Sequence, residues 1–71
     1  MNGDTVYVWQ EQTGDGWGVI VAFIPMVGFH GPLLSRDEAI AQEFGAIARG
    51  HGRANGNPIR LARFALEEVI A

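Results

Sequence analysis

Histidines and carboxylates are the side chains of this 71-residue chain whose chemistry suits metal binding or acid–base catalysis. His30 and His51 are its only histidines and cysteine is absent, which leaves too few ligands for a structural zinc site. Asp37 and Glu38 suit the first turn of a helix, where the helix dipole favours negative charge, and no sequence feature places them in a catalytic cleft. The sequence therefore predicts no metal ion, no cofactor and no catalytic residues, and we expect a protein that is not an enzyme.

A glycine-rich segment, GDGWG at residues 14–18, superficially resembles a phosphate-binding loop. Such loops lead from a strand into a helix whose N-terminus holds the anion. Here strand-like sequence stands on both sides of the glycines, so the segment predicts a turn between two strands.

The five basic residues are all arginines, and four of them fall within residues 49–63, where there is no acidic residue. The whole chain nevertheless carries a formal charge of −3, which argues against general affinity for nucleic acid. A local basic patch beside aromatic rings would still allow contacts with phosphates and bases. The alternative function is therefore a small nucleic-acid-binding protein that uses Arg49, Arg53, Arg60 and Arg63.

The composition, 48% apolar and 18% charged, is that of a chain that folds as one small domain over residues 1–71. Without cysteine there are no disulfides to stabilise it. A domain of this size buries a limited apolar core, so its stability is small or depends on a second subunit.

The elements that position these residues begin with two strands. Residues 5–12, TVYVWQEQ, alternate between two faces and are rich in β-branched and aromatic side chains. A turn of small and polar residues follows, and residues 17–25 resume strand composition, which predicts an antiparallel hairpin. The second strand is apolar on both faces, so the face that a helix leaves bare needs a loop of this chain, a second copy or a partner. Its two faces carry Trp17, Val19, Val21 and Phe23 on one side and Ile20, Ala22 and Ile24 on the other.

Residues 25–34, PMVGFHGPLL, alternate large apolar side chains with Gly and Pro. This pattern predicts an irregular loop, because neither a helix nor a strand tolerates so many interruptions. The loop is expected either to fold over the sheet as a lid or to offer a contact surface.

A helix is predicted over about residues 36–50, because Ser35 and Glu38 have the spacing of a capping box. Gly45 in mid-helix predicts a close backbone approach at that point, and Gly50 or Gly52 is expected to end the helix. Packing on the sheet is predicted for one apolar stripe, formed by Ile40, Phe44, Ile47, Ala48 and His51.

The last segment allows two interpretations. Asn57-Pro58 could open a helix over residues 57–71, which would give a ββαα arrangement. A third strand over about residues 59–68 instead widens a hairpin that is marginal alone, and avoids placing Glu67 and Glu68 at the negative end of a helix. We therefore expect an α+β fold of ββαβ type, with the C-terminal helix as the alternative.

An uncharged stretch over residues 17–34 has about the length of a membrane span. Pro25, Pro32 and three glycines interrupt it, so it cannot form a continuous apolar helix. No basic residue precedes Arg36, so the pattern of a secretory signal is also missing. We expect a cytoplasmic protein without membrane contact.

Three segments, GWGVIVAFIP, GFHGPLLSRDEAIA and GNPIRLARF, together resemble small uncharacterised proteins encoded by phages of GC-rich actinobacteria. The likeness spans roughly residues 5–68, and a GC-rich genome also fits the use of arginine in place of lysine. No activity is known for that group. The resemblance implies action inside an infected cell, in the cytoplasm of the host.

The main functional expectation is a non-enzymatic protein-interaction module. Its apolar surface exceeds what one helix can cover, so we expect it to self-associate as a homo-oligomer, to bind a host protein, or both. Aromatic and apolar residues of this kind commonly supply the energy of protein interfaces. The candidate binding residues are Trp9, Trp17, Val19, Val21, Phe23 and Phe29.

Overall fold

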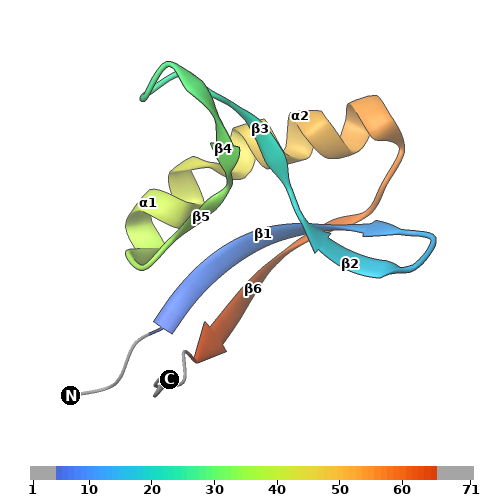
Figure 1. The fold of residues 1–71 in the computed structure, drawn as a ribbon, viewed down its shortest axis with the longest axis horizontal. Helices are drawn as coiled ribbons and strands as arrows, with labels where there is room; N and C mark the ends of the chain where they lie inside the picture. Colours follow the sequence, from blue (N-terminus) through green and yellow to red (C-terminus); the bar gives the residue numbers. More distant parts are fainter. Residues whose placement is uncertain (1–4, 66–71) are drawn as a thin grey trace, which may run out of the picture.

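The structure is a computed structural model that describes residues 5–65 of the chain, and Figure 1 shows its fold. It combines antiparallel strands with two helices and is broadly α+β, as predicted. The elements follow one another as β1 (Thr5–Thr13), β2 (Gly16–Val19), β3 (Val21–Ile24), β4 (Phe29–Pro32), β5 (Leu34–Ser35), α1 (Glu38–Glu43), α2 (Gly45–Asn55) and β6 (Ile59–Ala65).

Strand β1 is the centre of a four-stranded sheet. Along one edge it pairs with β6, in a register that runs from Thr5 opposite Ala65 to Glu11 opposite Ile59. Its other edge is shared by β2, which pairs with the end of β1, and by β5, which pairs with residues 7 and 8. The turn between β1 and β2 uses Gly16 at a φ of 128°, a backbone conformation that favours glycine. The first strand and its turn are therefore as predicted.

A three-way junction of backbone hydrogen bonds divides the second strand. The Trp9 N–H donates to the Leu33 carbonyl, the Leu33 N–H to the Ile20 carbonyl, and the Ile20 N–H to the Trp9 carbonyl. Beyond Ile20 the chain leaves β1, and β3 pairs with β4 in a separate two-stranded sheet. The prediction of one continuous strand over residues 17–25 was therefore wrong, because its two halves pair with different partners.

The segment after β3 is more regular than predicted. Only residues 25–28 form a turn, with Gly28 at a φ of 81°, and the chain then returns through β4 and β5 to the edge of β1. His30, which we expected in a loop, lies in β4. The prediction of an irregular loop over residues 25–34 was therefore wrong for residues 29–34. Gly31 and Pro32 are tolerated there because they lie in a strand at a sheet edge, paired with β3.

The helical segment begins two residues later than predicted. Asp37 is the N-cap, and its side chain accepts hydrogen bonds from the backbone of Ala39 and Ile40. Ser35 accepts only the N–H of Asp37, so the capping box of Ser35 and Glu38 was a wrong assignment. Asp37 is the N-cap in place of Ser35 because it lies next to the first turn, where one of its carboxylate oxygens accepts both N–H groups.

A break at Phe44 separates α1 from α2. Next to it the indole N–H of Trp9 donates to the Ala41 carbonyl at 2.8 Å, and a Cβ on Gly45 would lie 3.4 Å from the Trp9 ring. The close backbone approach predicted at a mid-helix Gly45 is therefore not found, because Gly45 is the first residue of α2 and its neighbours are the side chains of Trp9 and Arg49. The predicted end at Gly50 or Gly52 was wrong: α2 continues to Asn55, and Gly56 closes it in the left-handed conformation.

The last described element is a strand, β6, so the prediction of a strand from residue 59 is confirmed and the alternative helix is wrong over residues 59–65. The predicted continuation to residue 68 lies outside the described residues. Gly52 allows β6 to start against α2, because a Cβ there would lie 2.7 Å from the Ile59 side chain.

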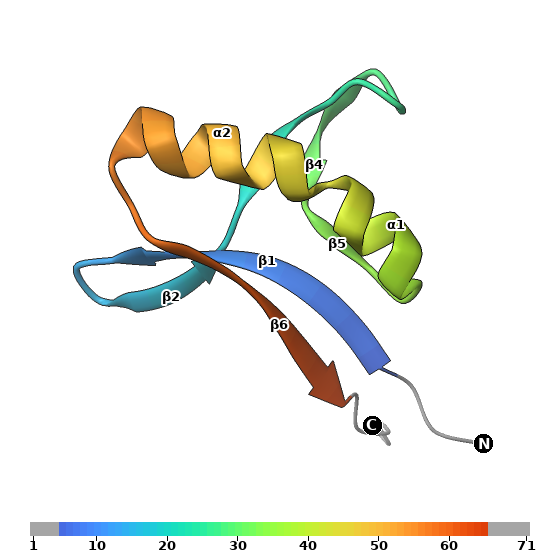
Figure 2. The same ribbon diagram turned by 180° about the vertical axis from the view of Figure 1, so that it is seen from behind.

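Both helices lie on one side of the strands, and α2 passes behind β3 in Figure 1 and in front of it in Figure 2. Helix α1 contacts β1 and β5, and α2 contacts β1, β3 and β6. Of the predicted helical stripe, Phe44 and Ala48 are buried, whereas Ile40 is 44% exposed because the chain turns at Phe44. The core cluster between the layers consists of Trp9, Ile20, Ile24, Leu33, Phe44 and Ala48.

Candidate interaction surfaces

The face of the sheet that points away from the helices is apolar. Strand pairing places side chains that are directly opposite on the same face, so Val6 and Val8 share a face with their partners on β5 and β6. The alternation from Val19 to Ile24 sends the odd-numbered side chains to this face and the even-numbered ones to the core. We call this surface the outer face; its residues are Val6, Val8, Val19, Val21, Phe23, Leu34, Ala62 and Phe64.

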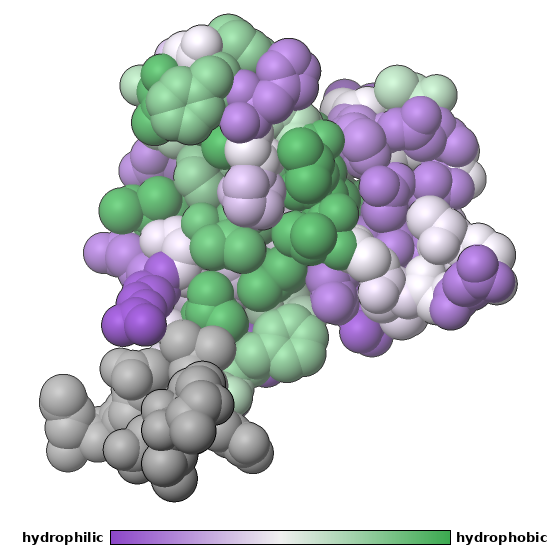
Figure 3. Space-filling view, viewed as in Figure 1, coloured by the Kyte–Doolittle hydropathy of each residue, from purple (hydrophilic) through white to green (hydrophobic). Residues whose placement is uncertain are grey.

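No element among residues 5–65 covers the outer face. Val21 is 54% exposed and Phe23 is 48% exposed, and Val19, Leu34 and Phe64 each expose more than two fifths of their surface. Figure 3 shows apolar side chains gathered over the β3–β4 hairpin and the middle of the sheet, on the side seen in Figure 1. Monomeric proteins rarely expose a contiguous apolar area of this kind, and where one is exposed it commonly marks an interaction site.

Two ring contacts frame the outer face. At the β2 end, the Arg60 guanidinium lies 4.1 Å from the centre of the Trp17 ring, and its Nε donates to Gln10 at 2.8 Å. At the β4 end, the rings of Phe23 and His30 meet edge to face with centroids 5.5 Å apart. The polar side chains at both ends of the outer face therefore have partners within the chain. The middle of the face carries no charge.

The structure brings together part of the predicted binding set. Val19, Val21 and Phe23 lie on the outer face with Trp17 at its margin. Trp9 faces the helices, where its indole N–H donates to the Ala41 carbonyl, whereas Val8 next to it points to the outer face and is equally buried, at 8% exposure. Phe29 lies apart at the start of β4, in register with the inward-facing Ile24.

Sequence reasoning missed the contributions of β5 and β6 to this surface. Leu34 pairs with Val8, 26 residues earlier in the chain, and Phe64 pairs with Val6, 58 residues earlier. Both complete the outer face. Their only signal was the alternation in LLS and IRLARF. The loop predicted as a possible lid does not cover the face, because β4 lies beside β3 in its plane.

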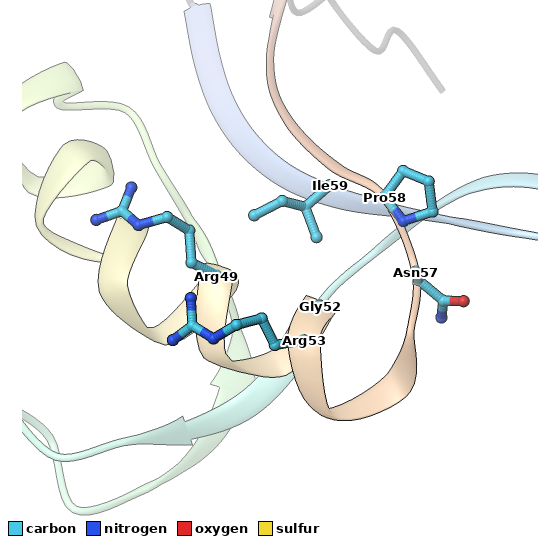
Figure 4. A pocket seen from close by; sticks show the side chains of 6 residues that line it. All are labelled: Arg49, Gly52, Arg53, Asn57, Pro58 and Ile59. Carbon is cyan, nitrogen blue, oxygen red and sulfur yellow. The ribbon is translucent and has the colours of Figure 1, made fainter.

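The predicted basic residues divide between two surfaces. Arg49 and Arg53 extend from the same side of α2 above a groove of about 300 Å³, as Figure 4 shows. Arg60 belongs to the margin of the outer face through Trp17, and Arg63 faces the helical side, opposite Tyr7. The groove is lined by Arg49, Gly52, Arg53, Asn57, Pro58 and Ile59.

A partly buried polar cluster joins the end of α2 to β1. Glu11 accepts a hydrogen bond from the Asn57 amide at 2.9 Å, and its other oxygen lies 3.0 Å from His51 Nε2. The Asn57 hydrogen bond first, and the contact with His51 second, hold the pKa of the Glu11 carboxyl below its ordinary value. This cluster fixes α2 on the sheet, and it has the partners of a structural contact rather than an open catalytic site.

The described part of the chain, residues 5–65, holds no group of three or more acidic, histidine or cysteine side chains arranged to bind a metal ion. Within the same residues, no helix has the length and apolar character needed to cross a membrane. Comparisons of the chain with protein-family models, with curated proteins and with solved structures gave no match in any of the three.

Proposed function

We propose that the protein is an interaction module that self-associates by packing its outer face on the outer face of a second copy. The observation that carries this proposal is the contrast between the two faces of one sheet. Helices cover one face, and the other exposes five large apolar side chains in a contiguous area. An antiparallel sheet in a two-layer domain normally turns polar side chains to water, so an apolar outer face calls for a cover that a second copy would supply.

A second copy suits this surface because the middle of the outer face is uncharged and rich in β-branched side chains. Two such faces can pack as stacked sheets about 10 Å apart without burying an unpaired charge. Arg60, the charged residue at the margin, is already held by Trp17 and Gln10.

Size-exclusion chromatography with light scattering tests the proposal. The wild-type chain is expected to show twice the monomer mass at high concentration, and Val21→Glu should shift it to monomer, because a buried unpaired carboxylate opposes association. Val27→Glu is the matched control: Val27 is 52% exposed, much like Val21, but lies in the β3–β4 turn. A monomer mass for the wild type at every concentration would rule out self-association.

A further inference from the structure

Strand β6 has a free edge among the described residues, since its only strand partner there is β1. Gln12 N–H donates to the Pro58 carbonyl, and bonded pairs alternate in an antiparallel ladder, so residues 60, 62 and 64 direct their backbone groups to β1. The N–H and C=O groups of Ile59, Leu61, Arg63 and Ala65 therefore point outward from the sheet. Such an edge is a template for another extended segment.

Unpaired positive charge lies beside this edge. Arg49 and Arg53 are one helical turn apart on α2, and within residues 5–65 neither has a hydrogen-bond or ion-pair partner. Residues 44–65 contain no acidic residue, so neither α2 nor β6 supplies one. Like charges at this spacing repel each other, and an anionic ligand would relieve the repulsion.

The groove of about 300 Å³ connects the two features, because it is lined both by these arginines and by the first residues of β6. Figure 4 shows Arg49 and Arg53 on one side of the groove, with Ile59 pointing toward α2. Arg63 lies further along β6 on the helical side of the sheet. A strand added to β6 would therefore send alternate side chains toward three guanidinium groups.

We propose that the free edge of β6 binds an extended acidic peptide by strand addition, with its carboxylates on Arg49 and Arg53. Guanidinium groups bind carboxylates through paired hydrogen bonds, and the edge supplies the backbone pairing that fixes register. This geometry favours a peptide over a nucleic acid: the edge offers alternating donors and acceptors, and Arg60 is directed to the opposite face and stacked on Trp17. The peptide site does not use the outer face.

Fluorescence anisotropy with a labelled peptide tests the proposal. The probe has alternating Glu and Val over about eight residues, which is enough to span β6, and its control has Gln in place of Glu. The acidic probe is expected to bind the wild-type chain, and Arg49→Gln with Arg53→Gln should weaken it about tenfold or more. Arg60→Gln, the same change on the opposite face, should leave binding unchanged.

Ala65→Pro tests strand addition separately from charge. It removes an N–H that points to the free edge, which an edge strand tolerates, and it should weaken the probe severalfold without changing the fold seen by circular dichroism. Equal binding of the Gln control peptide, or no effect of the double arginine variant, would overturn the proposal. So would a lack of peptide binding, including the case in which a single-stranded oligonucleotide binds through the same arginines.

The variants also distinguish this site from self-association through the outer face. Val21→Glu is expected to remove the dimer and to leave peptide binding intact, whereas Arg49→Gln with Arg53→Gln should do the reverse. If Ala65→Pro removed the dimer and Val21→Glu did not, β6 would be the dimer contact, and both proposals would be wrong.

Discussion

Trp9 shows at the scale of one residue how this small chain stabilises its core without disulfides. Its backbone joins three strand segments at the junction with Ile20 and Leu33, its ring is buried under the helices, and its indole N–H reaches the Ala41 carbonyl. A buried indole needs such an acceptor, and here it takes a carbonyl beside the helix break. We therefore assign Trp9 to the core and not to the outer face.

Glu11 carries the prediction about pH. Its folded-state pKa is lowered, chiefly by the Asn57 hydrogen bond, so ionised Glu11 stabilises the fold fully at pH values above its ordinary, unfolded-state pKa. That contribution is lost as the pH falls through the lower folded pKa. Glu11→Gln should reduce the free energy of unfolding at neutral pH by about 1 kcal/mol, and its stability should then fall less than that of the wild type on acidification.

Urea unfolding between neutral and acidic pH measures this effect. Glu43→Gln makes the same change of charge at an exposed side chain without a hydrogen bond, and it should keep the acid sensitivity of the wild type. Identical acid sensitivity of Glu11→Gln and the wild type would show that the cluster with His51 and Asn57 contributes nothing to the pH dependence.

At the scale of the element, two glycines of α2 allow a prediction about the contact between α2 and β6. At Gly52 a Cβ would lie 2.7 Å from Ile59 Cγ2 and 3.0 Å from the Asn57 carbonyl, so Gly52→Ala must push β6 away from the helix. Overpacking of this kind typically costs about 1–3 kcal/mol. At Gly50 a Cβ would meet nothing within 4 Å, so Gly50→Ala should stabilise the helix by up to about 1 kcal/mol.

Thermal unfolding of the two alanine variants tests this, because their melting temperatures should shift in opposite directions from that of the wild type. Gly52→Ala should melt below the wild type and Gly50→Ala above it. A Gly52→Ala chain as stable as Gly50→Ala would mean that α2 and β6 are not in close contact at this point.

The elements predicted well are those whose signals are local. Alternation identifies β1 and most of β6, and the small polar residues between β1 and β2 identify their turn. The division at Ile20 and the break at Phe44 have other causes: the first follows from hydrogen bonds to Trp9 and Leu33, and the second lies beside the Trp9 indole, 32 residues from Ala41. Contacts of that range leave no period in the sequence.

The same distinction applies to the candidate surfaces. Val19, Val21 and Phe23 were recognised because they alternate within one strand, and their exposure follows from the helices covering the opposite face. Leu34 and Phe64 join them only through strand pairing. Arg49 and Arg53 were recognised with Arg60 as one basic stretch, but strand geometry directs Arg60 to the other side of the sheet.

At the scale of the whole molecule, the small core bears on the proposed self-association. Only Ile20 and Leu33 are large side chains with essentially no exposure among the described residues, so most apolar groups retain part of their surface in the isolated chain. Burial of the outer face by a second copy would stabilise the folded state, because it adds apolar burial that the unfolded chain lacks.

The melting temperature should therefore rise with protein concentration, since unfolding of a dimer is coupled to its dissociation and mass action favours the folded dimer at high concentration. Val21→Glu should melt at the same temperature at all concentrations and match the wild type only at high dilution, because its exposed position costs the monomer little. Val27→Glu should keep the concentration dependence of the wild type. Calorimetry over a hundredfold range of concentration measures all three, and a wild-type melting temperature that does not change would mean that the bare outer face contributes nothing to stability through a second copy.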